Sequence, residues 1–238
     1  MRLCLILLYL TTFSFITCAK SETPLSELAS HIRLPYQKGE HVSPSELKLY
    51  ELQIKMIGES FKSKEPLCYN YDEPYQKIQK ELAILVAKSA VSDSKYILEA
   101  AVMADSFSDV KRLVEAGAPF ITRRLSWGAS LLHIAAIHSS PKVINYLHSQ
   151  GIDVNIKIED TGVTPLHLAV NSNKTMNIVA LVELGADVNA KDDQGSVPII
   201  NTFGCKDIDT FNYLLKKGTK IYPKVIEVAD KIGANIES

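Results

Sequence analysis

Two histidines, His133 and His167, are the residues whose type and spacing could do chemistry in this sequence. An imidazole can ligate zinc or transfer a proton near neutral pH, and a separation of 34 residues suits equivalent positions in a repeating structure. A zinc site needs further ligands, however, and the positions one period outward hold Glu99 and Ile200. Because an isoleucine cannot ligate a metal, we expect no metal site here.

Catalytic motifs are absent from the sequence. It has no Gly-x-Ser-x-Gly nucleophile turn, no Walker-type glycine loop and no His-Glu-x-x-His zinc motif. Its carboxylates are numerous, but the sequence pairs none of them as acid and base. We therefore expect a protein that is not an enzyme and holds no cofactor. The alternative is an enzyme with its site in residues 20–95, for which the rest of the chain is a substrate platform.

The composition is that of an ordinary globular protein. Of the 238 residues, 46% are hydrophobic and 22% are charged, which is enough for one repeat domain and a small accessory region. The net charge of −1 gives no electrostatic reason to expect nucleic acid or an anionic membrane surface as a partner.

An internal repeat must position these side chains. Four glycines recur at spacings of 34, 34 and 33 residues, namely Gly117, Gly151, Gly185 and Gly218. A second pattern begins 21 residues before each glycine, as in the segment that opens with Thr164 and Pro165. A threonine can cap a helix through its hydroxyl, and a proline suits the first helical position. A glycine in the left-handed conformation can end the second helix of each unit.

The segment Thr164-Pro165-Leu166-His167-Leu168-Ala169 resembles the ankyrin signature Thr-Pro-Leu-His-x-Ala at every defined position. The segment 130–135 keeps the Leu, His and Ala, whereas those at 96–101 and 197–202 are degenerate. The resemblance implies an all-α fold, an ankyrin-repeat solenoid of about four helix-turn-helix repeats with short hairpin-like loops. We place the repeats within 96–221, at residues 96–129, 130–163, 164–196 and 197–221.

The resemblance also implies a structural role for His133 and His167, which in this family hydrogen-bond within and between repeats. A buried imidazole satisfied in this way does no chemistry. His138 and His148 lie near the second helix of the second repeat, and we expect both at the surface.

A protein partner is the further implication of the resemblance, bound through loop tips and the first helices along a concave face. The predicted binding residues form three tips: Arg123, Arg124 and Trp127; Lys157, Glu159 and Asp160; Lys191, Asp192 and Asp193. Tryptophan and arginine are enriched in binding hot spots, where truncation can cost over ~2 kcal/mol. The alternative for Trp127 is that it packs against the repeat edge.

The flanking segments lack the repeat signature. Residues 43–95 form a predicted N-terminal helical region, with a capping box at Ser43–Glu46 and a second helix opening at Glu73. We expect it to cap the open end of the first repeat, the alternative being a helix pair that binds a partner. Residues 20–42 are a predicted loose leader. Residues 222–238 are a predicted capping helix, over 223–232, and tail.

Residues 1–19 have the plan of a secretory signal peptide. Met1-Arg2 supplies a positive charge, an uncharged and mostly apolar run follows, and Thr17-Cys18-Ala19 places small residues before a cleavage point. The apolar run is short for a bilayer span, which needs about 20 residues. We expect cleavage after Ala19 and no membrane span in the mature protein. The alternatives are an uncleaved anchor and lipoprotein processing at Cys18.

Two cysteines, Cys68 and Cys205, remain after such cleavage. One precedes the first repeat and the other lies in the fourth. Stacked helices are about 8–10 Å apart, whereas a disulfide spans at most about 7 Å between Cα atoms. Unless the N-terminal region folds back along the stack, the two cannot meet, and we expect free thiols.

These features predict an exported, non-catalytic module for protein–protein interaction. We expect a bacterial protein that is periplasmic or secreted and monomeric, and that acts as an inhibitor or immunity-type protein toward an envelope enzyme. The alternative within the same class is a secreted effector that binds a host protein.

Overall fold

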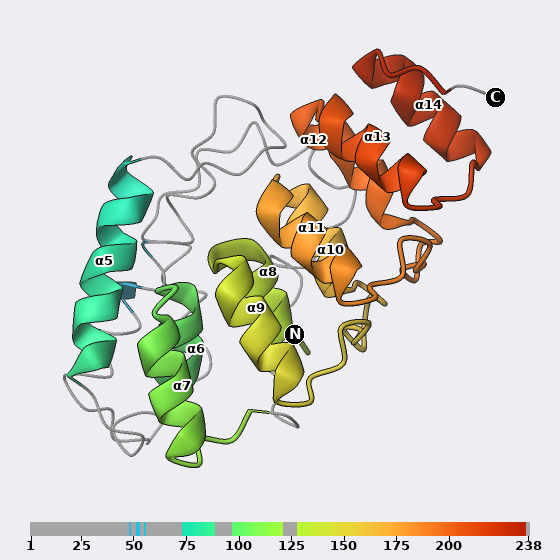
Figure 1. Ribbon diagram of the computed structural model, residues 1–238. Coiled ribbons are helices and arrows are strands. Elements are labelled where there is room, and N and C mark those ends of the chain that lie inside the picture. The colour runs from blue at the N-terminus through green and yellow to red at the C-terminus, as the bar shows by residue number, and fades with distance from the viewer. Residues whose placement is uncertain are drawn as a thin grey trace.

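The computed structural model describes residues 48, 51–52, 55, 73–88, 97–120 and 128–236 (Figure 1). All regular structure in these residues is helical, as predicted. The predicted signal 1–19, the leader 20–42 and Cys68 lie outside the described residues. So do the three binding residues predicted for the first tip, Arg123, Arg124 and Trp127.

Helices in successive antiparallel pairs make up the body of the molecule (Figure 1). The pairs are α6 (Ile97–Met103) with α7 (Phe107–Glu115), α8 (Leu131–His138) with α9 (Pro141–Ser149), and α10 (Pro165–Asn171) with α11 (Thr175–Glu183). A fourth unit contains the 3-10 helix η2 (Pro198–Asn201), α12 (Thr202–Cys205) and α13 (Ile208–Lys216). The first helices stack as α6, α8, α10 and η2, and the second helices stack as α7, α9 and α11.

The apolar core lies between these two rows of helices. Its fully buried side chains include Leu113, Leu132, Ile144, Leu147 and Leu166. Each pair contributes one apolar face to the core and cannot bury that face alone, so neighbouring pairs stabilise one another.

The periodic glycines end the second helices, as their spacing predicted. Gly117, Gly151, Gly185 and Gly218 have φ between +85° and +98°. A Cβ atom added at any of the four would meet no other atom within 4 Å, so conformation and not space requires glycine. After α11, for example, Gly185 N–H donates to the Val182 carbonyl and Ala186 N–H to the Leu181 carbonyl, which is a Schellman motif.

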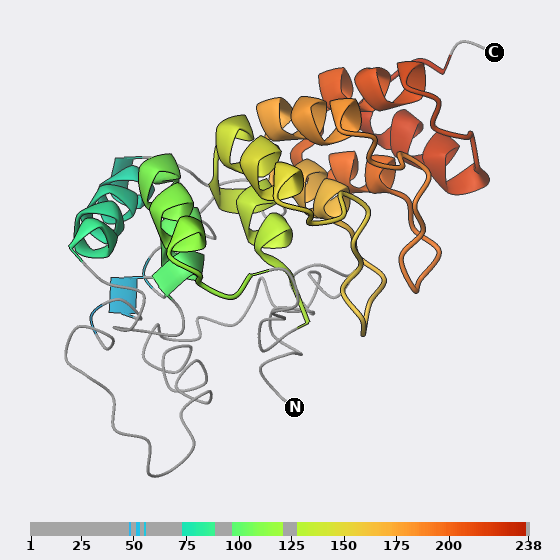
Figure 2. The same cartoon turned by 60° about the horizontal axis from the view of Figure 1, so that its bottom comes forward.

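Loops between the repeats leave the stack on a single side. Figure 2 shows that the loop joining α9 to α10 and the loop joining α11 to η2 project in the same direction. They correspond to the predicted second and third tips.

The first helix of the fourth unit differs from the prediction. It begins as a 3-10 helix over Pro198–Asn201 before the short α12. Val197 has no hydroxyl to cap this helix, and Ile200 stands where the second and third repeats have histidine. Without a capping pair, the tighter 3-10 turn replaces the first α-helical turn.

The N-terminal helix α5 (Glu73–Ala87) packs against α6 and covers that end of the stack, as predicted (Figure 1). Leu82 and Val86 on its inner face are fully buried, and Leu52 from the preceding helical segment joins the same core. Arg112 on α7 donates to the Val86 carbonyl at the end of α5, with a distance of 3.1 Å. This bond fastens the cap to the first repeat.

The opposite end is closed by α14 (Pro223–Ile232), which occupies the residues of the predicted closing helix. Val225, Val228 and Ile232 are buried, and Gly233 ends the helix with φ +77°. In the described part of the chain, none of the helices has the length and apolar character needed to cross a membrane.

The prediction of a free thiol is wrong for Cys205, which is disulfide-bonded. Its partner lies outside the described residues. The prediction assumed that the chain before the repeats does not return along the stack, and the repeat spacing gives no information on that point.

Candidate protein-binding surface

The ring nitrogens of His167 and His133 are used in hydrogen bonds inside the fold. The Thr164 N–H donates to His167 Nδ1 at 3.2 Å, and the Thr164 Oγ1 lies 2.8 Å from the same nitrogen. Nδ1 is therefore an acceptor, which places the ring proton on Nε2, 3.1 Å from the Ser196 carbonyl. Burial lowers the pKa of His167, in agreement with a neutral ring.

His133 repeats this arrangement one unit earlier. Its Nδ1 accepts from the Ser130 N–H at 3.1 Å, and its Nε2 lies 3.1 Å from the Val163 carbonyl. Each histidine thus caps its own helix and reaches into the loop that leads to the next repeat. Within the described residues, no three His, Cys, Asp or Glu side chains gather as a metal site would require.

Two asparagine side chains, Asn155 and Asn189, form a ladder of hydrogen bonds that joins each loop to the next unit. Asn155 donates from Nδ2 to the Gly185 carbonyl at 3.2 Å, and its Oδ1 accepts from the Asp187 N–H at 2.7 Å. Asn189 makes the same two bonds with Gly218 and Lys220 of the next unit, at 3.0 and 2.7 Å. Each amide therefore imitates the hydrogen bonding of a neighbouring strand and fixes the spacing between loops.

The second and third tips are joined to each other. Lys157 Nζ donates to the Lys191 carbonyl at 2.8 Å, and the Asp193 N–H donates to the Thr161 carbonyl at 2.9 Å. These bonds bring together residues that were predicted from separate loops, Lys157, Lys191 and Asp193, along one edge.

Asp192 has a structural role that the prediction missed. Its Oδ1 accepts from the backbone N–H groups of Gln194 and Ser196, at 3.0 and 2.8 Å, which closes the turn at the third tip. Lys191 Nζ lies 5.1 Å from the centroid of the Tyr222 ring, an arrangement that suits a cation–π contact.

The remaining predicted residues of these tips are exposed. Lys157, Glu159, Asp160, Lys191 and Asp193 present two ammonium groups and three carboxylates to solvent. The two described tips therefore form a rigid edge of mixed charge with a small acidic excess.

His138 is buried, which corrects the prediction that it lies at the surface. It is 7% exposed, and its Nδ1 lies 2.7 Å from the Tyr75 hydroxyl of α5. Ala104 and Ser172 occupy the equivalent positions of the neighbouring repeats, and both are also buried. The small side chains at these positions could have indicated that His138 is buried. The asparagines of the ladder were likewise visible as a recurrent Asp-Val-Asn, but their bonds to the next unit were not.

Comparison with known proteins agrees with this architecture. The family model for ankyrin repeats in three copies matches residues 94–192. An ankyrin repeat protein of fowlpox virus is 27% identical over 151 residues, which cover 61% of this chain and 44% of that protein. The mouse B-cell lymphoma 3 protein homolog is 31% identical over 118 residues, covering 47% of this chain and 26% of that protein.

A bacterial relative is Protein PhlB of Serratia liquefaciens, 30% identical over 103 residues that cover 43% of this chain and 45% of that protein. The chain thus spans less than half the length of each of these relatives. The matched range includes the helix pairs α6–α7, α8–α9 and α10–α11 and ends before the degenerate fourth unit. Residues 94–192 therefore match the model of three ankyrin repeats, and the stacked helix pairs have the fold of an ankyrin solenoid.

Proposed function

We propose that this protein is a non-catalytic module that binds a protein partner along the edge of its loop tips. Ankyrin repeats generally mediate binding between proteins. The observation that carries the proposal is the pair of bonds from Lys157 to the Lys191 carbonyl and from Asp193 to the Thr161 carbonyl. Tips that are already fixed lose little conformational entropy on binding, so more of the contact energy contributes to affinity.

The exposed charges of this edge define the surface that a partner meets. Glu159, Asp160 and Asp193 outnumber the two lysines of the same tips. Such a mixed surface favours specificity and association rate through charge complementarity. The first tip adds Arg123, Arg124 and Trp127 to the proposed surface by its sequence.

Export from the cytoplasm is part of the proposal. Residues 1–19 have the pattern of a signal peptide, and the disulfide at Cys205 suits an oxidising compartment outside the cytoplasm. The bacterial relative supports a bacterial source. Under this proposal the mature protein is a periplasmic or secreted monomer that inhibits or neutralises an enzyme of the cell envelope. Recovery of a host protein instead would identify it as a secreted effector.

Crosslinking and mass spectrometry of the exported fraction from the source organism test the proposal. We expect a specific protein partner, whose recovery falls at least about tenfold in the variant Asp160→Lys with Asp193→Lys. Asp230→Lys, on the exposed face of α14, is the matched control and should leave recovery unchanged.

Arg124→Ala and Trp127→Ala test the first tip in the same assay. Unchanged recovery in these two would assign them to structure alone. Unchanged recovery in all tip variants, or no partner recovered by intact folded protein, would overturn the proposed function.

A further inference from the structure

Three lysines follow one another where the fourth unit ends. Lys216 and Lys217 lie at the end of α13, and Lys220 lies in the loop of residues 217–222 that leads to α14. All three side chains are exposed, and the sequence holds no acidic residue between Asp209 and Glu227. In the described part of the chain, none of the three lysines makes an ion pair.

The repeat register shows that these charges depart from the other units. In the fourth unit, lysine occupies the two positions before the helix-ending glycine and the second position after it. The third unit has Glu183, Leu184 and Asp187 at these positions, and the second unit has Ser149, Gln150 and Asp153. The charge at equivalent positions is therefore reversed at the last unit of the stack.

An exposed aliphatic side chain lies beside the lysines. Ile221 is 51% exposed, whereas Val154 and Val188, which stand at the same distance after their glycines, are buried. In the fourth unit Tyr222 replaces the asparagine of the ladder, and α14 begins directly after it. The row of projecting loops ends at this point, so Ile221 stays open to solvent.

Bonds from the third loop hold the backbone of this surface in place. Asn189 Nδ2 donates to the Gly218 carbonyl at 3.0 Å, and its Oδ1 accepts from the Lys220 N–H at 2.7 Å. A segment that is already fixed loses little conformational entropy when a partner binds it.

The ammonium groups are spread along this surface and do not converge on one point. Lys217 Nζ lies 5.4 Å from the centroid of the Tyr213 ring, and Lys191 Nζ lies 5.1 Å from that of Tyr222. Lys220 stands in the loop that joins α13 to Tyr222. Separate cations of this kind suit an extended chain, which advances about 3.3 Å per residue, better than one small anion.

The lysine surface, as we call it, consists of Lys216, Lys217, Lys220 and Ile221, with Lys191 at its border. We propose that it binds an acidic segment of a protein partner, with an aliphatic side chain of that segment packed against Ile221. Carboxylates complement the lysines, and burial of the two aliphatic side chains adds affinity that does not depend on salt. The inference rests on the proposed function, because the bound partner supplies the segment.

A polypeptide fits this surface better than an anionic membrane. The loop of residues 217–222 is shorter than those of residues 150–164 and 184–197, which project from the stack in Figure 2. These two longer loops carry the exposed carboxylates of Glu159, Asp160 and Asp193. A flat anionic surface would meet those carboxylates first, whereas a peptide chain can lie beside the loops.

NMR titration of the isotope-labelled full chain at low salt tests the inference. The probes are acetyl-Glu-Glu-Leu-Glu-Glu amide, the same peptide with glutamine in place of every glutamate, and the acidic peptide with serine in place of leucine. Each is added to about 10 mM, enough to fill most of a site with a Kd of about 1 mM. We expect shifts of the backbone amides of residues 216–222 with the acidic leucine peptide and none with the glutamine peptide. The serine peptide should bind at least about threefold more weakly.

Variants assign the binding to named side chains. Lys217→Glu with Lys220→Glu should weaken binding of the leucine peptide at least about tenfold, because two attractive charges become repulsive. Ile221→Ser should remove the difference between the leucine and serine peptides. The matched control is Lys77→Glu with Lys80→Glu, which makes the same change of charge on exposed positions of α5, at the other end of the stack.

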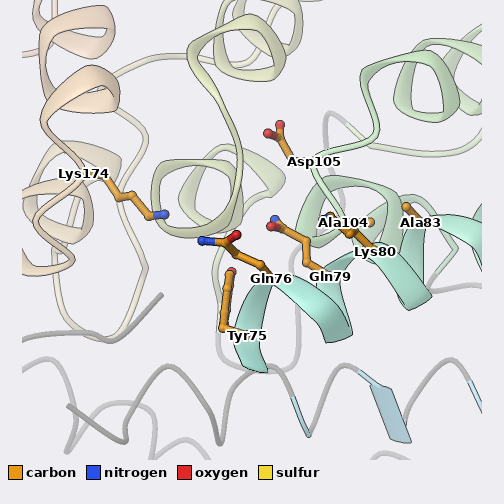
Figure 3. A pocket seen from close by; sticks show the side chains of 8 residues that line it. All are labelled: Tyr75, Gln76, Gln79, Lys80, Ala83, Ala104, Asp105 and Lys174. Carbon is orange, nitrogen blue, oxygen red and sulfur yellow. The ribbon is translucent and has the colours of Figure 1, made fainter. Parts of the chain in front are cut away.

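The control also covers a second place where lysines line a hollow. A pocket of about 420 Å³ lies between α5 and the turns that follow the first helices, and Lys80 and Lys174 are among its lining residues (Figure 3). Binding that is lost in the α5 control and kept in the Lys217 and Lys220 variant would place the peptide there and overturn the inference.

Three further results would overturn the inference: no shifts with the acidic peptide, equal shifts with the glutamine peptide, or wild-type affinity in the Lys217 and Lys220 variant. Binding to phosphatidylglycerol vesicles without binding to the peptide would also overturn it and identify a membrane surface. The peptides need no natural partner, so the two proposals can fail separately. If the peptide does not bind but the tip variants still abolish partner recovery, only this inference falls. If the peptide binds and no partner is found, only the proposed function falls.

Discussion

At the scale of single residues, one imidazole connects two repeats. His167 accepts a hydrogen bond from the Thr164 N–H of its own helix and donates from Nε2 to the Ser196 carbonyl of the following loop. All three residues are buried, so water cannot replace a lost bond. The His167 side chain therefore joins a helix to a loop, and its contribution to the free energy of unfolding can be measured.

Replacing His167 by leucine keeps an apolar volume but removes both bonds. We expect the free energy of unfolding to fall by about 2–4 kcal/mol, because the Thr164 N–H and the Ser196 carbonyl stay buried without partners. Urea denaturation followed by circular dichroism measures the loss. His148→Leu is the control, since His148 is only half-buried and bonds the Ile152 carbonyl of its own loop. A loss no larger than that of the control would contradict the fastening role.

The buried His138 predicts a dependence of stability on pH. Burial, with a smaller effect of the nearby Lys174 charge, lowers the pKa of His138 from 6.5 to about 3. The unfolded chain then binds the proton more readily than the folded chain, so stability is complete above pH 6.5 and falls as pH falls toward 3. Between pH 6.5 and 4.5 this residue should account for a loss of about 2–3 kcal/mol.

His138→Asn isolates this effect, because asparagine can still bond the Tyr75 hydroxyl but does not titrate. Urea denaturation at several pH values should show a shallower loss below pH 6.5 in the variant than in the wild type. Carboxylates lower stability in acid in both proteins and cancel in the comparison. Parallel pH profiles would contradict the prediction.

At the scale of elements, local signals predicted most of the fold. Prolines at first helical positions, the four glycines and the apolar periodicity are read from neighbouring residues, and they located the helix pairs and α14. Interactions between distant residues were not predictable in this way. Tyr75 and His138 are 63 residues apart, and the bonds of Asn155 depend on how one loop lies beside the next. The 3-10 helix at the start of the fourth unit could have been predicted from the sequence, since Val197 and Ile200 cannot form the capping hydrogen bonds that Thr164 and His167 make.

Helix α5 is held by polar bonds to helix ends as well as by its apolar face. The variant Tyr75→Phe with Gln79→Leu removes the hydroxyl at His138 and the donor to the Met103 carbonyl. We expect backbone amides of α5 to exchange hydrogen at least about tenfold faster, because local opening becomes easier by at least about 1.4 kcal/mol. Hydrogen-exchange mass spectrometry measures this change peptide by peptide.

Amides of α10 and α11 serve as the internal reference for α5 and should exchange at the wild-type rate. Lys77→Leu, an exposed position on α5, is the matched control variant. If α5 exchanges at the wild-type rate in the double variant, its attachment depends on the apolar packing of Leu82 and Val86 and on the Arg112 bond instead.

At the scale of the whole molecule, the disulfide of Cys205 bears both on the cellular compartment of the protein and on its free energy of unfolding. Cleavage after Ala19 would leave Cys68 as the other cysteine of the mature chain, so a protein cleaved there should contain one intramolecular disulfide and no free thiol. Alkylation under denaturing conditions, followed by intact-mass measurement, should add label only after reduction. The same measurement reads the cleavage point and any lipid at Cys18.

Serine variants then test which cysteine is the partner. A disulfide that closes so long a loop restricts the unfolded chain, so Cys205→Ser should lower the free energy of unfolding by about 2–5 kcal/mol. Cys68→Ser should cost the same, and the double variant should cost no more than either single one, because all three lack the same bond. If Cys68→Ser leaves stability unchanged and lowers the number of free thiols by one, Cys205 pairs with a cysteine of the first 19 residues. That segment would then remain in the folded protein, and cleavage after Ala19 would be wrong.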